Sequence, residues 1–122
     1  MILVDTSVWV DHFRRRNDDL SILLRDGQVA CHDFVIGELA CGNLRNRNMV
    51  LQLLSEIARA EIASHVEVLL LLEERKLTGK GIGWIDAHLL ASCLISHLRL
   101  WTRDAALANA AALLGCHFSA GR

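Results

Sequence analysis

Short apolar runs alternate along the chain with longer segments in which apolar side chains recur every three or four residues. The runs are too brief for helices and are typical of strands buried in a sheet. They predict strands at residues 2–4, 29–31, 61–63, 99–102 and 116–118. The longer segments predict helices that begin at Thr6 and that cover residues 18–26, 33–41, 47–60, 65–77, 84–98 and 104–114.

Strands that alternate with helices indicate the α/β class. The crossovers between such strands are right-handed, which gives a mostly parallel sheet with helices on both faces. Since the chain has no proline, no repeat and no low-complexity stretch, we expect a single domain over residues 1–122. Ligands bind outside the carboxyl ends of the strands in these sheets. Asp5 and Asp104 lie just past two predicted strands and are therefore expected at the functional edge.

Composition limits the possible functions. The chain has 122 residues, of which 52% are hydrophobic, so a sizeable core is possible without disulfides. Its formal net charge is −1, whereas a protein that binds nucleic acid mainly by neutralising phosphates usually carries a basic excess. If this chain handles nucleic acid, bound metal ions must supply much of the local positive charge.

The cysteines and the apolar runs bear on where the protein acts. The four cysteines are widely spaced and form no CxxC pair. The opening residues MILVD lack the basic region of a secretory signal, and the longest apolar run, residues 68–72, is far short of a membrane span. We therefore expect reduced thiols, a cytoplasmic location and no contact with a membrane.

Two acidic residues occupy the apolar faces of predicted helices. Asp86 shares a face with Leu89, three residues further on, and Glu38 falls midway between Val35 and Cys41 at the same spacing. These positions predict carboxylates that point inward. A buried carboxylate costs several kcal/mol unless a partner compensates it, so two in one short chain require an explanation.

The alternatives to a shared site are local ones. Each inward acid could pair with a buried arginine, and Asp5 and Asp104 could cap the helices that follow them. No matching row of buried basic residues is visible in the sequence. A divalent cation would compensate all four acids together, because magnesium binds carboxylate oxygens and bridges to phosphate. Two such ions about 3.5–4 Å apart can stabilise both oxygens of an in-line displacement at phosphorus.

Four segments in this order resemble the PIN domain, and more narrowly the VapC toxins of bacterial and archaeal toxin-antitoxin modules. The segments are ILVDTSVWVDHFR, IGELACGNL, GIGWIDAHLLASCL and LWTRDAAL. The resemblance covers essentially the whole chain. It implies a three-layer α/β/α sandwich, cleavage of RNA (commonly transfer or ribosomal RNA) that depends on Mg²⁺ or Mn²⁺, homodimers, and inhibition by a VapB-type antitoxin.

The resemblance also assigns residues. The acidic quartet of the family, which is both catalytic and metal-binding, falls on Asp5, Glu38, Asp86 and Asp104. The neighbouring hydroxyl residues also match the family and are expected to orient a carboxylate or a metal-bound water. They are Thr6, Ser7 and Thr102.

Three arginines are candidates for substrate binding. Arg103 stands next to Asp104 and is the predicted neighbour of a phosphate. Arg14 and Arg15 belong to a basic cluster that could contact an RNA backbone or an antitoxin, or could be a solvated helix end favoured by the helix dipole.

Other residues suggest no competing site. The histidines lack zinc-ligand spacing, and no nucleophile motif is present. Asp11 is expected to be a surface acid. With few aromatic residues in the chain, Trp9, Trp84 and Trp101 are expected in the core rather than as a base-stacking platform.

Two further functions are compatible with this fold class. A receiver-type phospho-acceptor domain has similar length, but it needs adjacent acids after the first strand and a lysine after a late one; here Asp5 stands alone and the late strand ends in Thr-Arg-Asp. A PIN relative that binds RNA or a partner without cutting is the other alternative. An intact quartet argues against it.

Overall fold

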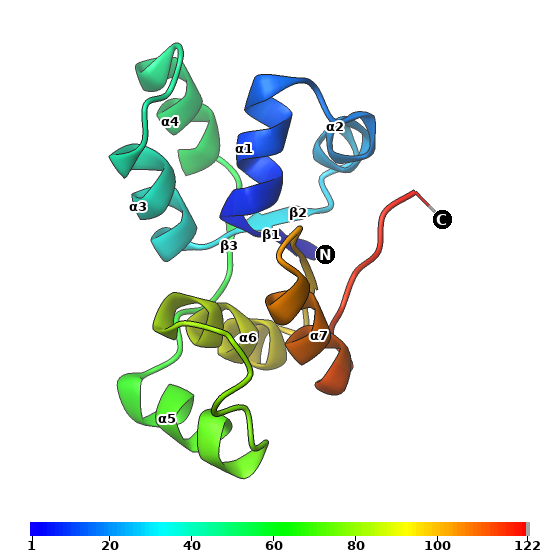
Figure 1. Cartoon of the computed structure of the whole chain (residues 1–122). Helices are drawn as coiled ribbons and strands as arrows, with labels where there is room; N and C mark the ends of the chain where they lie inside the picture. The colour runs from blue at the N-terminus through cyan, green and yellow to red at the C-terminus, as the bar shows by residue number, and fades with distance from the viewer. Residues whose placement is uncertain (122) are drawn as a thin grey trace.

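The computed structural model describes residues 1–121, and Figure 1 shows their arrangement. The strands are β1 (Ile2–Val4), β2 (Val29–Cys31), β3 (Ala58–Arg59) and β4 (Arg99–Trp101). The helices are α1 (Thr6–Arg14), α2 (Asp18–Arg25), α3 (Asp33–Cys41), α4 (Arg47–Ser55), α5 (His65–Glu74), α6 (Trp84–Ser96) and α7 (Ala105–Leu113). No helix within residues 1–121 is both long enough and apolar enough to cross a membrane.

The strands form one parallel sheet in the order β3-β2-β1-β4. The register aligns Leu3 of β1 with Ala30 of β2 on one side and with Leu100 of β4 on the other. The chain moves outward from β1 to β2 and β3, and then returns to the opposite side of β1 to form β4. The order of the strands therefore reverses between β1 and β4, which is where ligands bind in open α/β sheets.

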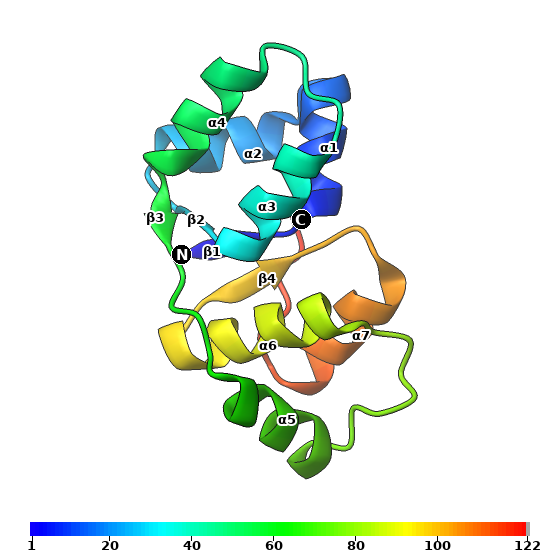
Figure 2. The same cartoon turned by 90° about the vertical axis from the view of Figure 1, so that its left-hand side faces the viewer.

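The reversal also distributes the helices over two faces. Figures 1 and 2 show α1 to α4 on one side of the sheet and α5 to α7 on the other. Right-handed crossovers require this arrangement, because connections that run in opposite directions along the sheet pass over opposite faces. The result confirms the predicted three-layer α/β/α sandwich.

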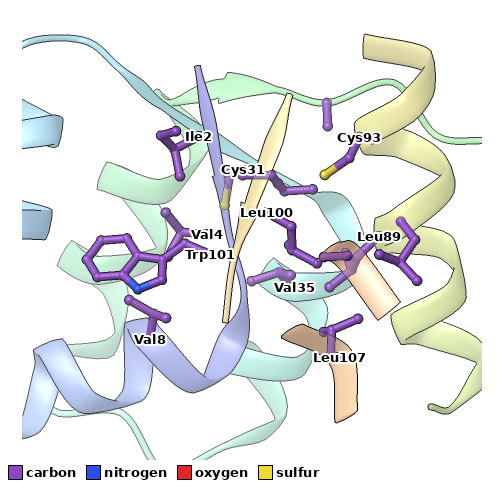
Figure 3. Close-up of a cluster of buried hydrophobic side chains, with 14 of the residues drawn as sticks. Ile2, Val4, Val8, Cys31, Val35, Leu89, Cys93, Leu100, Trp101 and Leu107 are labelled. Carbon is purple, nitrogen blue, oxygen red and sulfur yellow. The ribbon is translucent and has the colours of Figure 1, made fainter. Parts of the chain in front are cut away.

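The core lies between the sheet and these two helical layers. Figure 3 shows Val4 of β1 and Leu100 and Trp101 of β4 meeting side chains from the helices, including Val8 and Leu107. Apart from Arg99, every residue of β1, β2 and β4 is buried. These strands consist of continuous apolar runs because both of their faces are covered. The tight packing of β1 and β4 fixes the positions of the residues that follow them.

The predicted boundary between residues 47–60 and 61–63 was wrong. The helix ends at Ser55, and the strand lies earlier, at Ala58–Arg59. Ile57 continues the helical spacing of apolar residues beyond the true end of the helix, so the pattern did not mark the end. Both residues of β3 are exposed, and an exposed two-residue edge strand leaves no apolar run to recognise.

Two other helices end two or three residues earlier than predicted. α5 ends at Glu74 and α6 at Ser96. Lys76 and His97 then adopt left-handed backbone conformations, with φ of 55° and 56°. Glycine usually occupies such positions at the end of a helix. Since neither residue is glycine, the sequence carried no local stop signal there.

The predicted strand at 116–118 is reduced to a single bridge. His117 pairs in parallel with Leu100 of β4. The Phe118 N–H donates to the Leu100 carbonyl at 2.9 Å, and the Leu100 N–H donates to the Cys116 carbonyl at 2.6 Å. The segment lies beside β4 as expected, but it is too short to count as a strand.

Candidate active site

The four acidic residues of the predicted quartet come from four separate segments. Asp5 directly follows β1, and Asp104 follows β4 as the cap of α7. Asp86 lies in the first turn of α6, and Glu38 lies in the middle of α3. α6 is followed directly by β4 and runs antiparallel to it. The first turn of α6 therefore lies near the carboxyl end of β4.

Asp5 is the buried member, with 7% of its surface exposed. Its Oδ2 atom accepts hydrogen bonds from Thr102 Oγ1 at 2.7 Å and from Ser7 Oγ at 2.9 Å. Its own N–H donates to the Trp101 carbonyl at 2.9 Å. Asp5 precedes α1, but its side chain makes no capping bond to that helix. Helix capping therefore does not explain this buried carboxylate.

The same two hydroxyls tie the turn after β1 to the turn after β4. Ser7 Oγ and Thr102 Oγ1 lie 3.3 Å apart. The Arg103 N–H donates to Ser7 Oγ at 3.0 Å, and the Asp104 N–H donates to Thr102 Oγ1 at 3.1 Å. A network in which each hydroxyl both donates and accepts holds the two turns in a fixed relation.

Asp104 and Glu38 are both exposed at the edge of the site. Asp104 Oδ1 accepts a hydrogen bond from the Leu107 N–H at 3.1 Å and so caps α7. This is the helix-capping role that the sequence left open for Asp104. Glu38 Oε1 accepts from Thr6 Oγ1 at 2.7 Å. The expectation that Glu38 points into the core was wrong. Cys41, which shares its helix face, is also exposed.

Asp86 is half-buried in the first turn of α6. Burial raises the pKa of its carboxyl group, and the negative charges of Asp5, Asp104 and Glu38 raise it further. The Gly83 N–H, which donates to Asp86 Oδ2 at 3.2 Å, acts in the opposite direction. The charged form of Asp86 is therefore disfavoured first by burial and then by three other acids that lie within electrostatic reach.

No basic side chain of the described residues pairs with any of these four acids. The ion pairs of residues 1–121 lie elsewhere: Arg16–Asp18, Arg25–Asp26, Arg59–Asp33 and Arg103–Asp11. The alternative that each inward acid has its own buried arginine therefore does not hold for this part of the chain. The negative charge at the carboxyl edge of β1 and β4 lacks a compensating cation from residues 1–121.

The donor set fits magnesium. Carboxylate oxygens are its preferred protein ligands, and it binds through one or two of them while keeping several waters. Within residues 1–121, no three acidic, histidine or cysteine side chains are grouped closely enough to hold an ion by themselves. A site that also uses water and substrate oxygens does not need such a group.

The predicted arginines are placed differently from one another. Arg103 lies beside Asp104, but its Nη1 contacts Asp11 Oδ2 on α1 at 2.8 Å. The side chain of Asp11 is only 19% exposed, so the expectation of a free surface acid was wrong. No local pattern links residues so far apart in sequence. Arg14 and Arg15 are exposed at the far end of α1, about 14 Å along the helix axis from Asp5.

The three tryptophans do not share one environment. Trp9 and Trp101 are buried, as expected. Trp84 is 39% exposed, so its assignment to the core was wrong. It is the first residue of α6, where the helix emerges from a glycine-containing loop, and the core ends before this position.

Comparisons with known proteins place the chain in a family. Residues 2–113 match the PIN domain family. The chain is 47% identical over 116 residues, 94% of each chain, to Ribonuclease VapC32 of Mycobacterium tuberculosis strain CDC 1551 / Oshkosh. The identity and coverage are the same for Ribonuclease VapC32 of strain ATCC 25618 / H37Rv. The protein therefore belongs to the PIN domain family and is similar to its VapC members.

Proposed function

We propose that this protein is a magnesium-dependent endoribonuclease that acts as the toxin of a toxin-antitoxin pair. The observation that carries the proposal is the electrostatic one. Four carboxylates from separate segments share one edge of the sheet without a basic partner among the described residues. Burial, together with the charges of the other three acids, disfavours ionisation of Asp86. The similarity to proteins named ribonucleases supports RNA as the substrate class.

Each acid has a role in this proposal. Asp5 and Asp86 are the principal ligands of Mg²⁺, for which Mn²⁺ can substitute, and Glu38 and Asp104 complete the site or position the attacking water. The ion would supply charge to hold the phosphate and would lower the pKa of water. Thr102 and Ser7 orient Asp5, because they donate to the same carboxylate oxygen.

The reaction is hydrolysis of a phosphodiester. Water attacks the phosphorus in line, the bond to the 3′-oxygen breaks, and the products carry a 5′-phosphate and a 3′-hydroxyl. The main demand on the protein is positioning and charge stabilisation. Arg103 is the arginine best placed to contact a phosphate, whereas Arg14 and Arg15 would contact RNA or a partner only at a distance from the acids.

The same proposal covers the setting in which the protein acts. We place it in the cytoplasm as a single domain over residues 1–122 that forms a homodimer. Its partners are an RNA substrate, with transfer or ribosomal RNA as the favoured target, and a VapB-type antitoxin that inhibits it.

Incubation of total cellular RNA with the protein and magnesium tests the proposal. We expect discrete cuts that a chelator abolishes and that added Mg²⁺ or Mn²⁺ restores, and mapping of the cut ends should find 5′-phosphates. Asp5→Asn should not cut, while Glu73→Gln, which removes an exposed acid on α5, should cut normally. Full activity of Asp5→Asn, or activity that ignores the chelator, would overturn the proposal.

A further inference from the structure

We propose that Trp84 is a stacking platform for a nucleobase of the RNA substrate, next to the acidic quartet. This inference rests on the proposed function and adds a specificity element to it. The indole is 39% exposed, so part of this large aromatic surface is free to contact a ligand. It belongs to the same first turn of α6 as Asp86, so a base stacked on it would hold the adjoining backbone close to the carboxylates.

Neighbouring rings hold the indole in place. The rings of His65 on α5 and His88 on α6 each lie 5.0 Å from it, measured between centroids, with interplanar angles of 52° and 86°. His88 is itself buried and packs edge-on against Phe34 at 4.8 Å. The indole is therefore supported from two helices, and a preorganised ring loses little entropy when a ligand stacks on it.

The loop that precedes Trp84 leaves open space next to it. A side chain at Gly83 would meet nothing within 4 Å, whereas one at Gly81 would touch Ala106 of α7 at 3.4 Å. At Gly81 the loop therefore passes close to the helix that Asp104 caps, and the position directly before Trp84 is unobstructed. We expect the RNA backbone to occupy that space.

The charge of the protein explains why stacking matters here. A chain with net charge −1 and an acidic site gains little from attraction to phosphate. Stacking on an aromatic ring supplies affinity that does not depend on charge, and it tolerates different bases because each presents a π face. The exposed apolar residues of α5, such as Val66, Leu69 and Leu70, are aliphatic and offer no such ring.

A binding cycle with abasic RNA tests this proposal without turnover. The Asp5→Asn protein is titrated with a short single-stranded RNA and with copies in which one nucleotide at a time lacks its base. We expect Trp84→Ala to weaken binding of the intact strand by roughly 5- to 150-fold. One abasic position should weaken binding to a similar extent when Trp84 is present and should have little further effect in Trp84→Ala.

Further variants separate stacking from support of the fold. Trp84→Phe keeps a ring and should retain most of the affinity for RNA. A base stacked on Trp84 should quench tryptophan fluorescence when RNA binds, and Trp84→Phe should lose this quenching, because the remaining Trp9 and Trp101 are buried. Phe13→Ala is the matched control: Phe13 has a similar exposed fraction, 36%, on α1. It should leave RNA binding unchanged. Thermal melting of every variant shows whether it is folded.

The outcomes distinguish this inference from the proposed function. Three results would refute the stacking role of Trp84. They are RNA binding by folded Trp84→Ala as tight as that of its parent, effects of abasic RNA and of Trp84→Ala that simply add, and no RNA binding by the protein at all. Cleavage by the unmodified protein and its loss in Asp5→Asn would still uphold the nuclease in the first two cases. Conversely, coupling between Trp84 and one base supports the platform even if no cleavage is found.

Discussion

Asp5 and Asp86 carry the same carboxyl group in opposite surroundings. Asp5 is buried at the end of a central strand, where two hydroxyls donate to one of its oxygens. Asp86 is half-buried at the start of a helix, where one backbone N–H opposes the effects of burial and of three other acids. Hydrogen bonds therefore stabilise the position of Asp5, whereas Asp86 lies where its negative charge is unfavourable.

The difference shows that a strand end and a helix start contribute different properties to a charged site. The strand end provides rigidity, because packing and hydrogen bonds fix Asp5 before any ligand arrives. The helix start provides unsatisfied negative charge, which a bound cation would relieve. Sites that bind ligands commonly sacrifice some stability of the free protein in this way.

The largest expected effect is that of Asp5→Asn on cleavage. The amide retains the shape of the side chain but removes the negative charge and places an NH₂ group where an oxygen accepted bonds. We expect the rate of RNA cleavage to fall by about a thousandfold or more. Initial rates on a labelled RNA at saturating magnesium measure this loss. A reduction of only a few fold would show that Asp5 is not central.

Thr102→Val tests whether the hydroxyl frame matters apart from the acid. The variant keeps the shape of the side chain and removes the donor to Asp5 and the acceptor for the Asp104 N–H. We expect cleavage to fall roughly 10- to 100-fold and the free energy of unfolding to fall by about 1–3 kcal/mol. Thr102→Ser should recover most of both. If valine has no effect, the hydroxyl frame does not support Asp5.

Asp86→Asn should stabilise the free protein while it abolishes cleavage. A raised pKa means that folding favours the protonated acid, so the stabilising contribution is present at low pH and is lost as pH rises through the folded-state pKa. At neutral pH the wild type therefore carries a penalty that asparagine removes. Because the group is only half-buried, we expect a gain of a few tenths to about 1 kcal/mol.

Denaturant unfolding in chelator, at neutral and at acidic pH, measures this gain. The advantage of Asp86→Asn should shrink on acidification, since the wild-type carboxyl then becomes protonated. Added magnesium should also narrow the gap, because an ion that binds only the folded wild type stabilises it. A variant less stable than the wild type at neutral pH would contradict the electrostatic account of Asp86.

The smallest expected effect concerns the Arg103–Asp11 pair. Asp11→Asn removes the ion pair that restrains the turn after β4, but the Arg103 N–H remains bonded to Ser7. Since Arg103 is largely exposed, we expect stability to change by less than about 1 kcal/mol and the KM for RNA to change more than kcat. A large fall in kcat would mean that the Arg103–Asp11 pair is needed, in addition to the Ser7 and Thr102 hydroxyls, to keep Asp5 in position.

Several features of the fold could be read from the sequence because their signals are local. The buried strands at Ile2–Val4 and Val29–Cys31 are uninterrupted apolar runs, and their boundaries were predicted correctly. The start of α6 at Trp84 was also predicted correctly. The two-residue strand β3 was misplaced because pairing with β2 defines it, and that pairing leaves no mark on its own residues.

The candidate site was predicted in the same uneven way. The positions of Asp5 and Asp104 followed from strand ends, and those of Glu38 and Asp86 followed from the apolar faces of their helices and from the resemblance to a family. The prediction that both helical acids point inward was wrong for Glu38, which is exposed, whereas Asp86 is half-buried. Helical periodicity identifies a face, but not how far the neighbouring elements extend over it.

The sequence by itself determined the α/β class, the parallel sheet and the segments that supply the acids, because apolar periodicity and strand-end positions act over short distances along the chain. Only the tertiary structure decided that Ser7 and Thr102 both donate to Asp5, that Arg103 pairs with Asp11, and that Trp84 is exposed. Those properties depend on which side chains meet across the sheet. Apart from the Ser7–Asp5 bond, these contacts join residues far apart in sequence, and no local pattern encodes them.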